Sequence, residues 1–378
     1  MAQTYTPGLK VSRGTALKRV RRLPLPGTIA VQQGEKVSAE IVVARTELPG
    51  QVRSLNVASL LGVQPEDIYD NMLKKESERI KRDEVIASSK GLFGLFKSQC
   101  KSPIDGTIES ISKITGQVML RETEIPVEIN AYVDGQIDEI IPNEGVVVQT
   151  YGTFIQGIFG VGGESIGQLV MACSSPDEKV SPDSLNSSMS DKIVVVGSLA
   201  TSELINKSIQ LGIKSIIAGG IDDSDLRQLL GYELGVAITG SEKIGTTIII
   251  TEGFGRIAIA DRTFGILKER EGMKASVNGA TQIRAGVIRP EVVVPEIGEN
   301  LGKGLSDDET KKSQNQLMIG TEVRIIREPH FGELAEVSEL PVELQQLETE
   351  AKVRILKVKL RRNGEEALLP RANVEIIA

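Results

Sequence analysis

The chain has 378 residues, a formal net charge of −7, one histidine and two cysteines. This length exceeds what one ordinary hydrophobic core supports, so several domains are expected. Aromatic residues make up 3% of the chain and tryptophan is absent, which argues against a base-stacking surface for single-stranded nucleic acid. Two isolated cysteines, no long apolar run and no signal-peptide core favour a cytoplasmic protein without a disulfide framework.

Residues 1–19 are predicted to form a basic N-terminal arm. The first 34 residues carry six cations and no acid, which leaves a charge of −13 for the rest of the chain. Because the acidic body attracts a cationic segment, contact with protein is favoured, and nucleic acid stays open as an alternative. The structural alternative is a disordered, solvated tail. The candidate partner-binding or RNA-binding residues here are Arg19, Arg21 and Arg22.

Residues 20–173 are predicted to form a β-rich domain that contains an internal repeat. The segment 27–45 has a strand, a glycine turn and a second strand, and the segment 71–88 repeats it at an offset of 43 residues. A short helical interruption lies between them. The matched positions are Gly34 with Ser77, Glu35 with Glu78, Val37 with Ile80, and Val43-Ala44 with Ile86-Ala87. Two further units, 101–122 and 130–152, each place an Asp-Gly turn before an alternating strand.

The repeated phrase GEKVSAEIVVAR and the units SPIDGTIESI and VDGQIDEIIPNEGVVV resemble the barrel-sandwich hybrid fold of biotinyl and lipoyl domains, also known from hammerhead modules. The resemblance implies a fold and no activity. Biotinyl and lipoyl domains carry their cofactor on a lysine at a hairpin tip. The nearest candidate, Lys113 in ISKIT, matches neither the Asp-Lys-Ala nor the Met-Lys-Met motif, so no cofactor is predicted.

A linker at 174–190, rich in serine, proline and aspartate, precedes a predicted α/β domain at 191–298. Apolar strands alternate with helical segments up to about residue 272, which is typical of a small parallel sheet. One helix is predicted to start at Thr201 or Ser202 and to end at Gly212, and a second is predicted to be capped by Asp222. A β-like segment, 275–295, trails this sheet.

Ligands of parallel sheets collect at the carboxyl ends of the strands, so candidate ligand-binding residues are sought there. The alternative interpretation is that βα turns and helix caps need the same residue types. The candidates are Gly219, Gly220, Asp222, Thr239, Gly253 and Arg256. The glycine-rich segment 157–169 lacks the Gly-Lys-Ser/Thr ending of a phosphate loop and is interpreted as a tight β connection.

A polar linker at 299–316 leads to the last predicted domain, 317–378. The phrase GTEVRIIREPHFGELAEV looks like a KOW motif, with Pro329 opening a turn, Gly332 at positive φ and alternating apolar residues on both strands. An Asn-Gly hairpin and a closing strand complete the resemblance to an SH3-like barrel. The lone histidine, His330, then lies in a loop, solvent-facing and without acid-base partners, so no catalytic role is predicted for it.

KOW barrels bind RNA or protein, and a strand of this predicted barrel is basic. From residue 317 onward, however, 9 basic residues face 11 acidic ones, which suits protein docking at least as well as RNA. The candidate partner-binding or RNA-binding residues are Lys352, Arg354, Lys357, Lys359 and Arg361. No nucleophile-base pair, carboxylate dyad or metal-ligand spacing is recognisable anywhere in the chain, so neither catalytic nor metal-binding residues are predicted.

Taken whole, the chain resembles bacterial KOW-domain proteins of unassigned activity that join hammerhead-like β repeats, an α/β domain and a KOW barrel. The leading hypothesis is a non-catalytic cytoplasmic scaffold that forms homo-oligomers through β modules and the basic arm. The alternatives are a transcription-associated or ribosome-associated factor that binds RNA or protein through the KOW barrel, and a protein whose α/β domain binds a small ligand. No membrane contact is expected.

Overall fold

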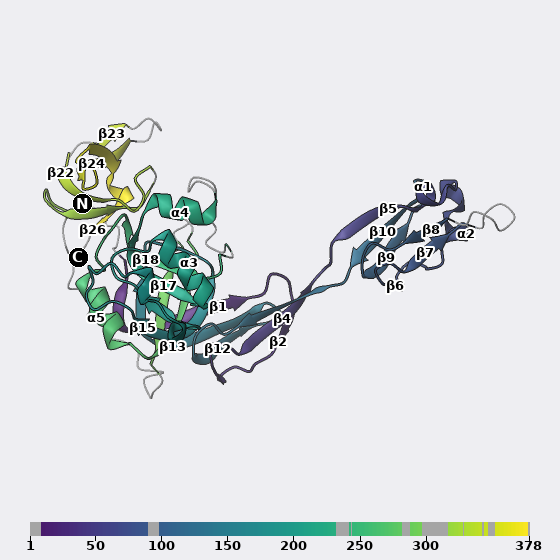
Figure 1. Cartoon of the computed structure of the whole chain (residues 1–378), viewed down its shortest axis with the longest axis horizontal. Helices are drawn as coiled ribbons and strands as arrows, with labels where there is room; N and C mark the ends of the chain where they lie inside the picture. Colours follow the sequence, from purple (N-terminus) through teal and green to yellow (C-terminus); the bar gives the residue numbers. More distant parts are fainter. Residues whose placement is uncertain are drawn as a thin grey trace.

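The computed structural model describes residues 9–89, 98–231, 242, 244–281, 288–296, 317–327, 329–341, 344–346 and 352–376. Strands dominate this part of the chain and form several sheets, with a few short helices, so the fold is β-rich and α+β with more than one unit. Figure 1 shows a main body, a C-terminal unit (residues 317–376) beside it, and a distal module (residues 51–122) that projects along the long axis.

One mixed sheet of eleven strands organises the main body, in the order β14-β18-β17-β16-β15-β19-β20-β13-β12-β3, with β1 paired to β13. Its strand β15 pairs with parallel β16 on one edge and antiparallel β19 on the other. The strands are β1 (Val11–Arg22), β3 (Lys36–Val37), β12 (Gly135–Ile141), β13 (Gly145–Gln156), β14 (Phe159–Val161), β15 (Glu164–Met171), β16 (Ile193–Val195), β17 (Ser215–Ile221), β18 (Thr247–Phe254), β19 (Lys274–Asn278) and β20 (Glu291–Pro295).

This continuous sheet differs from the expected separation of a β-rich domain from an α/β domain. The segment 174–190, expected to be a linker between domains, connects two neighbouring parallel strands, β15 and β16. It contains two 3-10 helices, η2 (Pro182–Ser184) and η3 (Ser187–Met189). The two expected domains share one sheet because the trailing segment 275–295 forms β19 and β20, which pair between β15 and β13.

The parallel part of the sheet, β15 to β18, carries three helices. All seven residues of β17 are buried, as expected for a parallel strand covered on both faces. Helix α3 (Ser202–Leu211) is capped by the Thr201 hydroxyl, which accepts from the Leu204 N–H, and ends at Gly212 in the left-handed conformation, as predicted. Helices α4 (Asp223–Leu230) and α5 (Asp261–Glu269) follow. Residues 233–240, one of the apolar segments that alternate with the predicted helices, lie outside the described residues.

The distal module is joined to the main body through a three-stranded sheet, β11-β4-β2, in which antiparallel β4 and β11 carry the chain out and back (Figure 1). The module holds a four-stranded sheet, β5-β10-β9-β6, a β7-β8 pair and short helices at its far end. The elements are β2 (Thr28–Ile29), β4 (Val42–Leu48), β11 (Ile125–Asn130), β5 (Val52–Asn56), α1 (Val57–Leu61), η1 (Pro65–Asp67), α2 (Ile68–Asn71), β6 (Arg79–Ile80), β7 (Val85–Ser88), β8 (Gln99–Lys101), β9 (Gly106–Ile111) and β10 (Gln117–Glu122).

The predicted repeat appears as a duplicated pattern of hydrogen bonds. In each copy a residue with positive φ lies two positions before a two-residue strand, and the aspartate of an Asp-Gly pair accepts a hydrogen bond from the backbone N–H two positions after that strand. The equivalent bonds are Gly34 N–H to Ile137 O (2.8 Å) and Ser77 N–H to Ile108 O (2.7 Å), and Ala39 N–H to Asp134 Oδ1 (2.7 Å) and Arg82 N–H to Asp105 Oδ1 (3.0 Å). The second copy is nested inside the first, so the distal module repeats the unit from which it projects.

The C-terminal unit is a six-stranded sheet in the order β23-β24-β22-β21-β26, with β25 also paired to β24. Gly332 and Gly364 have φ of 81° and 74°, as expected for turns between strands. The inward positions of the first two strands, among them Val323 and Val337, form its core. The elements are β21 (Glu322–Ile325), β22 (Leu334–Glu339), β23 (Leu344–Gln346), β24 (Lys352–Leu360), β25 (Glu366–Pro370), η4 (Arg371–Asn373) and β26 (Val374–Ile376). The predicted linker 299–316 lies outside the described residues.

Candidate functional site

The cations expected on an N-terminal arm lie instead on β1, which pairs with β13 along its length. From Val11 onward this segment is therefore part of the main sheet rather than an arm. Each cation of β1 reaches an acid of the same chain, so the acidic surface that attracts it belongs to its own body. The ion pairs are Arg13 with Glu269 (2.9 Å), Lys18 with Asp138 (2.7 Å), Arg19 with Glu291 (2.7 Å), Arg21 with Glu164 (2.7 Å) and Arg22 with Glu144 (3.3 Å).

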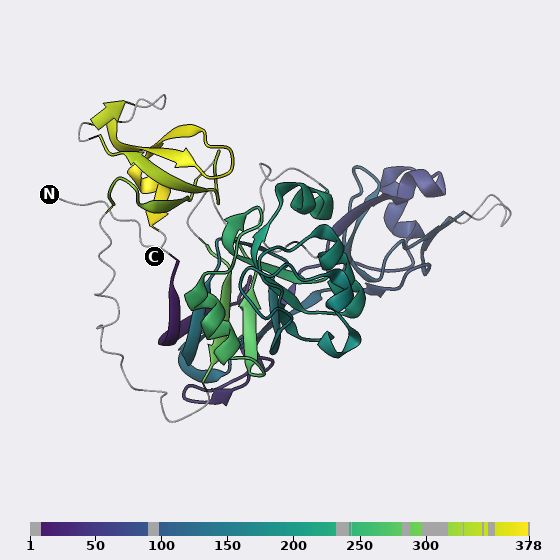
Figure 2. The ribbon, with the colours of Figure 1, turned by 60° about the vertical axis from the view of Figure 1, so that its left-hand side comes forward.

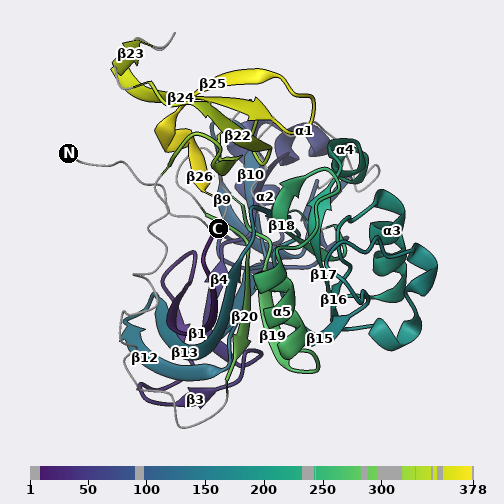
Figure 3. The same cartoon turned by 90° about the vertical axis from the view of Figure 1, so that its left-hand side faces the viewer.

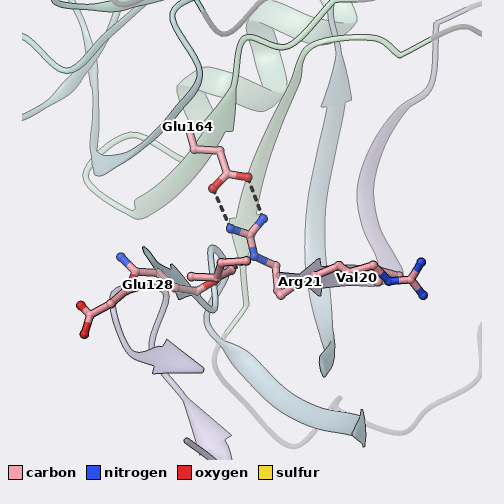
Figure 4. A pocket seen from close by; sticks show the side chains of 7 residues that line it. Val20, Arg21, Glu128 and Glu164 are labelled. Atoms are coloured by element: carbon pink, nitrogen blue, oxygen red, sulfur yellow. Dashed lines mark hydrogen bonds and ion pairs between the residues drawn. The ribbon is translucent and has the colours of Figure 1, made fainter. Parts of the chain in front are cut away.

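Arg21 stands at the edge of an open hollow of about 380 Å³ between β1, β11 and β15 (Figure 4). Its two terminal nitrogens donate to the Glu164 carboxylate at 2.7 and 2.8 Å, and its Nε donates to the Asn130 carbonyl at 2.8 Å. The guanidinium also lies 5.2 Å from the centre of the Tyr132 ring. The hollow is lined by Val20, Arg21, Arg22, Glu128, Ile129, Asn130 and Glu164.

The ring of Tyr132 lies beneath the Arg21 guanidinium. Burial, followed by the charge of Glu291, raises the pKa of the Tyr132 hydroxyl well above its usual range. The hydroxyl lies 3.2 Å from Glu291 Oε1. The Glu291 carboxylate also accepts two hydrogen bonds from the Arg19 guanidinium. The phenol therefore stays protonated and donates to this carboxylate, which gives it a structural role at neutral pH.

The carboxyl ends of the parallel strands, where a ligand site was sought, are filled by the chain itself. A Cβ on Gly219 or Gly220 would collide with the backbone of the segment 255–259 that follows β18. A Cβ on Gly253 would collide with the carbonyl of Gly332 in the C-terminal unit. These glycines therefore allow close approach of the protein's own backbone at these three positions.

The remaining candidates at this edge also make contacts within the chain. Asp222 holds the N-cap position of α4 without a side-chain capping hydrogen bond. Arg256 is exposed and donates to the Ser198 hydroxyl (3.3 Å) and the Asp177 carbonyl (3.2 Å). Thr239 lies outside the described residues. The structure thus brings Gly219, Gly220, Gly253 and Arg256 to one edge, with the chain's own segments packed against them.

A buried ionic network joins the C-terminal unit to the end of β18, and the sequence analysis missed it. Arg324 is 3% exposed and bonds to Glu375 (2.8 Å) and Glu252 (2.7 Å), while Arg289 bonds to the other oxygen of Glu375 (2.8 Å). Arg324 and Glu375 each stand between apolar residues, and they are cross-strand partners on β21 and β26. This alternation is equally typical of a solvent-exposed strand face, so the sequence gives no signal that another unit covers these charges.

Aromatic packing accompanies this network. Phe254 at the end of β18 lies between Phe159 and Phe331, with ring centroids 5.6 and 6.3 Å apart. Ile326 and Phe331 of the C-terminal unit pack into the core of the parallel sheet. Figure 3 shows the C-terminal unit above β18, and Figure 2 shows the unit beside the body from another side. The unit therefore packs against the body through apolar and ionic contacts.

The basic strand β24 is partly neutralised within the C-terminal unit. Lys357 pairs with Glu366 (2.7 Å) and Glu339 (3.3 Å), and Arg361 pairs with Glu322. Arg354 and Lys359 are exposed and make no ion pair with any residue the structure describes. The side chain of Lys352 lies outside the described part. Two of the five candidates thus remain as exposed cations.

His330 is less isolated than expected. Its side chain is 28% exposed, and Nδ1 lies 3.5 Å from Glu333 Oε1. Its carbonyl accepts the Glu333 N–H at 3.0 Å, which closes the turn before Gly332. The histidine thus lies in a loop, as expected, and is partly exposed with one carboxylate beside it.

The distal module exposes large apolar side chains at its far end, a surface named here the apolar tip: Leu60, Tyr69, Leu73 and Ile114. Ile114, on the hairpin between β9 and β10, is 90% exposed, and Leu60 on α1 is 56% exposed. The neighbouring Lys113 places its Nζ 4.9 Å from the centre of the Tyr69 ring. Lys113 therefore covers an aromatic face at the hairpin tip.

Within the described residues, no group of histidine, cysteine, aspartate and glutamate side chains is arranged to hold a metal ion. The helices of the same residues are all too short or too polar to cross a bilayer. Comparison with protein-family models and with curated proteins found no match for the chain.

Proposed function

We propose that the chain is a non-catalytic cytoplasmic assembly or scaffold protein that forms homo-oligomers through its β modules. The observation that carries this proposal is the apolar tip. Four large apolar side chains are exposed on α1, on α2 and the residues that follow it, and on the β9–β10 hairpin of a module that projects from the body. Exposed apolar side chains of this size are typical of protein-protein contacts. Self-association buries this surface.

The architecture supports the same proposal. The duplicated hydrogen-bond pattern favours a barrel-sandwich hybrid, lipoyl-like fold for both copies of the repeat. The six-stranded C-terminal unit with its glycine turns favours a KOW, SH3-like barrel. The end of β18 also supports a role in contacts, because Glu252 and Gly253 meet Arg324 and Gly332 of the C-terminal unit.

Light scattering and sedimentation at micromolar concentration test self-association. The parent chain is expected to form an oligomer, and the double variant Leu60→Glu, Ile114→Glu is expected to shift the mass toward that of the monomer, because two buried carboxylates oppose association. Leu368→Glu, at an exposed apolar position of the C-terminal unit, is the matched control and leaves the mass unchanged. A parent chain that is strictly monomeric contradicts the proposal.

The second candidate is a transcription-associated or ribosome-associated factor that binds RNA or protein through the C-terminal unit. The exposed Arg354 and Lys359 favour it, because phosphate contacts need cations that are not already paired. It predicts binding to RNA that weakens steeply with salt and is reduced by Arg354→Ala with Lys359→Ala. Equal retention of the variant and the parent on RNA at low salt excludes this use of the unit. A small-ligand site in the α/β part finds little support, because the chain itself fills the strand ends.

A further inference from the structure

The hollow beside Arg21 lies between two strand edges that face one another. Strand β1 pairs with β13 through one edge, and the other edge of β1 has no strand partner among the described residues. Strand β11 pairs with β4 through one edge and likewise ends its sheet. The lining residues of the hollow come from these two strands and from Glu164, so the hollow separates two free edges (Figure 4).

The ladder pattern identifies which backbone groups of β1 point into the hollow. Leu23 donates its N–H to Glu144 O at 2.7 Å, and in an antiparallel pair every second residue bonds the same neighbour. Arg21 and Arg19 therefore face β13, whereas Val20 and Arg22 direct their N–H and C=O groups outward. No described residue supplies a hydrogen-bond partner for these outward groups.

The same reasoning applies to β11, and its proline provides an independent check. Pro126 has no N–H, so its position must face away from β4. Alternate residues of a strand direct their backbone N–H and C=O groups to the same side, so those of Glu128 and Asn130 also point away from β4. Asn130 confirms it, because its carbonyl accepts the Arg21 Nε at 2.8 Å within the hollow. The free edge of β11 thus presents the N–H and C=O of Glu128 toward the hollow that β1 also lines.

We infer that this hollow is a groove for an extended segment of another protein, which adds as a strand to the free edge of β1. The segment would exchange backbone hydrogen bonds with Val20 and Arg22 and meet Glu128 on the opposite wall. An apolar side chain of the segment would cover Val20, which is 55% exposed, and Ile129. This groove lies on the main body, away from the apolar tip, and goes beyond the proposed self-assembly.

The charges of the groove favour a peptide over a free anion. The Arg21 guanidinium is committed to Glu164 and to the Asn130 carbonyl, Arg22 lies 3.3 Å from Glu144, and Glu128 lies 3.0 Å from Arg45. Each charged side chain that lines the hollow is therefore paired with an opposite charge. Among the described residues, the groups left without partners are those of the backbone, which another backbone complements.

Selection from a displayed library of random octapeptides against the full chain, followed by titration of the synthesised winners, tests the inference. The double variant Val20→Pro, Glu128→Pro removes two outward N–H groups and keeps the hydrogen bonds from β1 to β13 and from β11 to β4. The native Pro126 shows that β11 accepts proline at such an outward position. Binding of the winners is expected to weaken about tenfold, the effect of losing one or two backbone hydrogen bonds. The control variant Val20→Ala, Glu128→Gln keeps both N–H groups and retains binding within about twofold.

N-methylation of alternate amides of a winning peptide supplies a readout that does not depend on the fold of a variant. A bound peptide is expected to slow hydrogen exchange of the Arg22 amide, because that N–H then has a partner. Methylation of the peptide amides that face β1 is expected to abolish measurable binding and, with it, this slowing. Selection that yields no binder, or binders that tolerate the proline double variant and N-methylation, overturns the inference. Self-association through the apolar tip is measured separately and is unaffected by either outcome.

Discussion

At Arg324 two carboxylates distant in the sequence, Glu252 and Glu375, share one buried guanidinium. Glu375 is 1% exposed and also holds Arg289, so two cations and two anions form a neutral chain across the interface. Burying these charges is costly unless each has a partner, and removing one partner strands the others. Single residues at this junction therefore control whether the C-terminal unit stays docked.

Arg324→Met is expected to destabilise the docked state by about 3–5 kcal/mol, because it leaves Glu252 and one oxygen of Glu375 buried without a cation. Denaturant unfolding and limited proteolysis of the C-terminal unit measure the loss. The double variant Arg324→Met, Glu252→Gln leaves the neutral Arg289–Glu375 pair and is expected to recover part of the stability. A single variant that costs less than about 1 kcal/mol would show that the network contributes little to docking.

Cys173 offers a second residue-scale test. Burial, followed by the charge of Glu178, raises the pKa of its thiol to about 11. At pH 8 the thiolate is then about one part in a thousand, against about one in ten for a thiol of pKa 9. Thiol reagents are expected to react with Cys173 about a hundredfold more slowly in the folded chain than in denaturant. Equal rates in both states would rule out the buried, protonated thiol.

At the scale of elements, the nested repeat places residues of different type in the same strained turn. Gly34 has φ of 82°, and its counterpart Ser77 has φ of 68°. Positive φ costs a residue with a side chain about 1–2 kcal/mol, and glycine avoids this cost. The first copy therefore carries the favourable residue, and the second copy carries the strained one.

Ser77→Gly is accordingly expected to stabilise the distal module by about 0.5–1 kcal/mol, the relief of strain less the added entropy of the unfolded chain. Gly34→Ala is expected to destabilise by about 1 kcal/mol. The nearest atom to a Cβ at Gly34 is 4.0 Å away, so that cost is conformational and not steric. Thermal unfolding measures both shifts, and shifts of equal sign for the two variants would show that the turns are not equivalent.

At the scale of the whole molecule, the distal module enters and leaves through one pair of strands. Leu48 of β4 lies opposite Ile125 of β11, and Gly50 lies against the backbone of Glu122 and Thr123. The module also keeps its own core, separate from that of the body. The contacts that hold the body together therefore do not depend on the module.

Deletion of residues 51–122, which joins Gly50 directly to Thr123, is expected to leave the body folded with a four-residue loop between β4 and β11. Circular dichroism and a single cooperative melting transition check the fold. The isolated segment 51–122 is expected to fold separately through its own core. A deletion variant that is unfolded or insoluble would mean that body and module form one cooperative unit.

Much of the local structure follows from the sequence alone. The repeat at an offset of 43, the cap and stop of α3 at Thr201 and Gly212, and the turn at Gly332 depend on residues a few positions apart. These residues restrict φ or satisfy nearby backbone groups, so their effect is readable without knowledge of the fold. The β-rich and parallel α/β character follows for the same reason, from the period of the apolar residues.

The tertiary structure alone decided which distant groups meet. The cations of β1 look like those of a free arm in the sequence, yet they pair with acids of the body up to 272 residues away. Gly253 looks like part of a ligand site, yet Gly332 of the C-terminal unit packs against it. A charge or a glycine specifies what kind of neighbour it tolerates, and that preference is satisfied equally by solvent, a ligand, another protein or the chain itself. The choice among them is made by the free energy of packing whole sheets together, which no local pattern encodes.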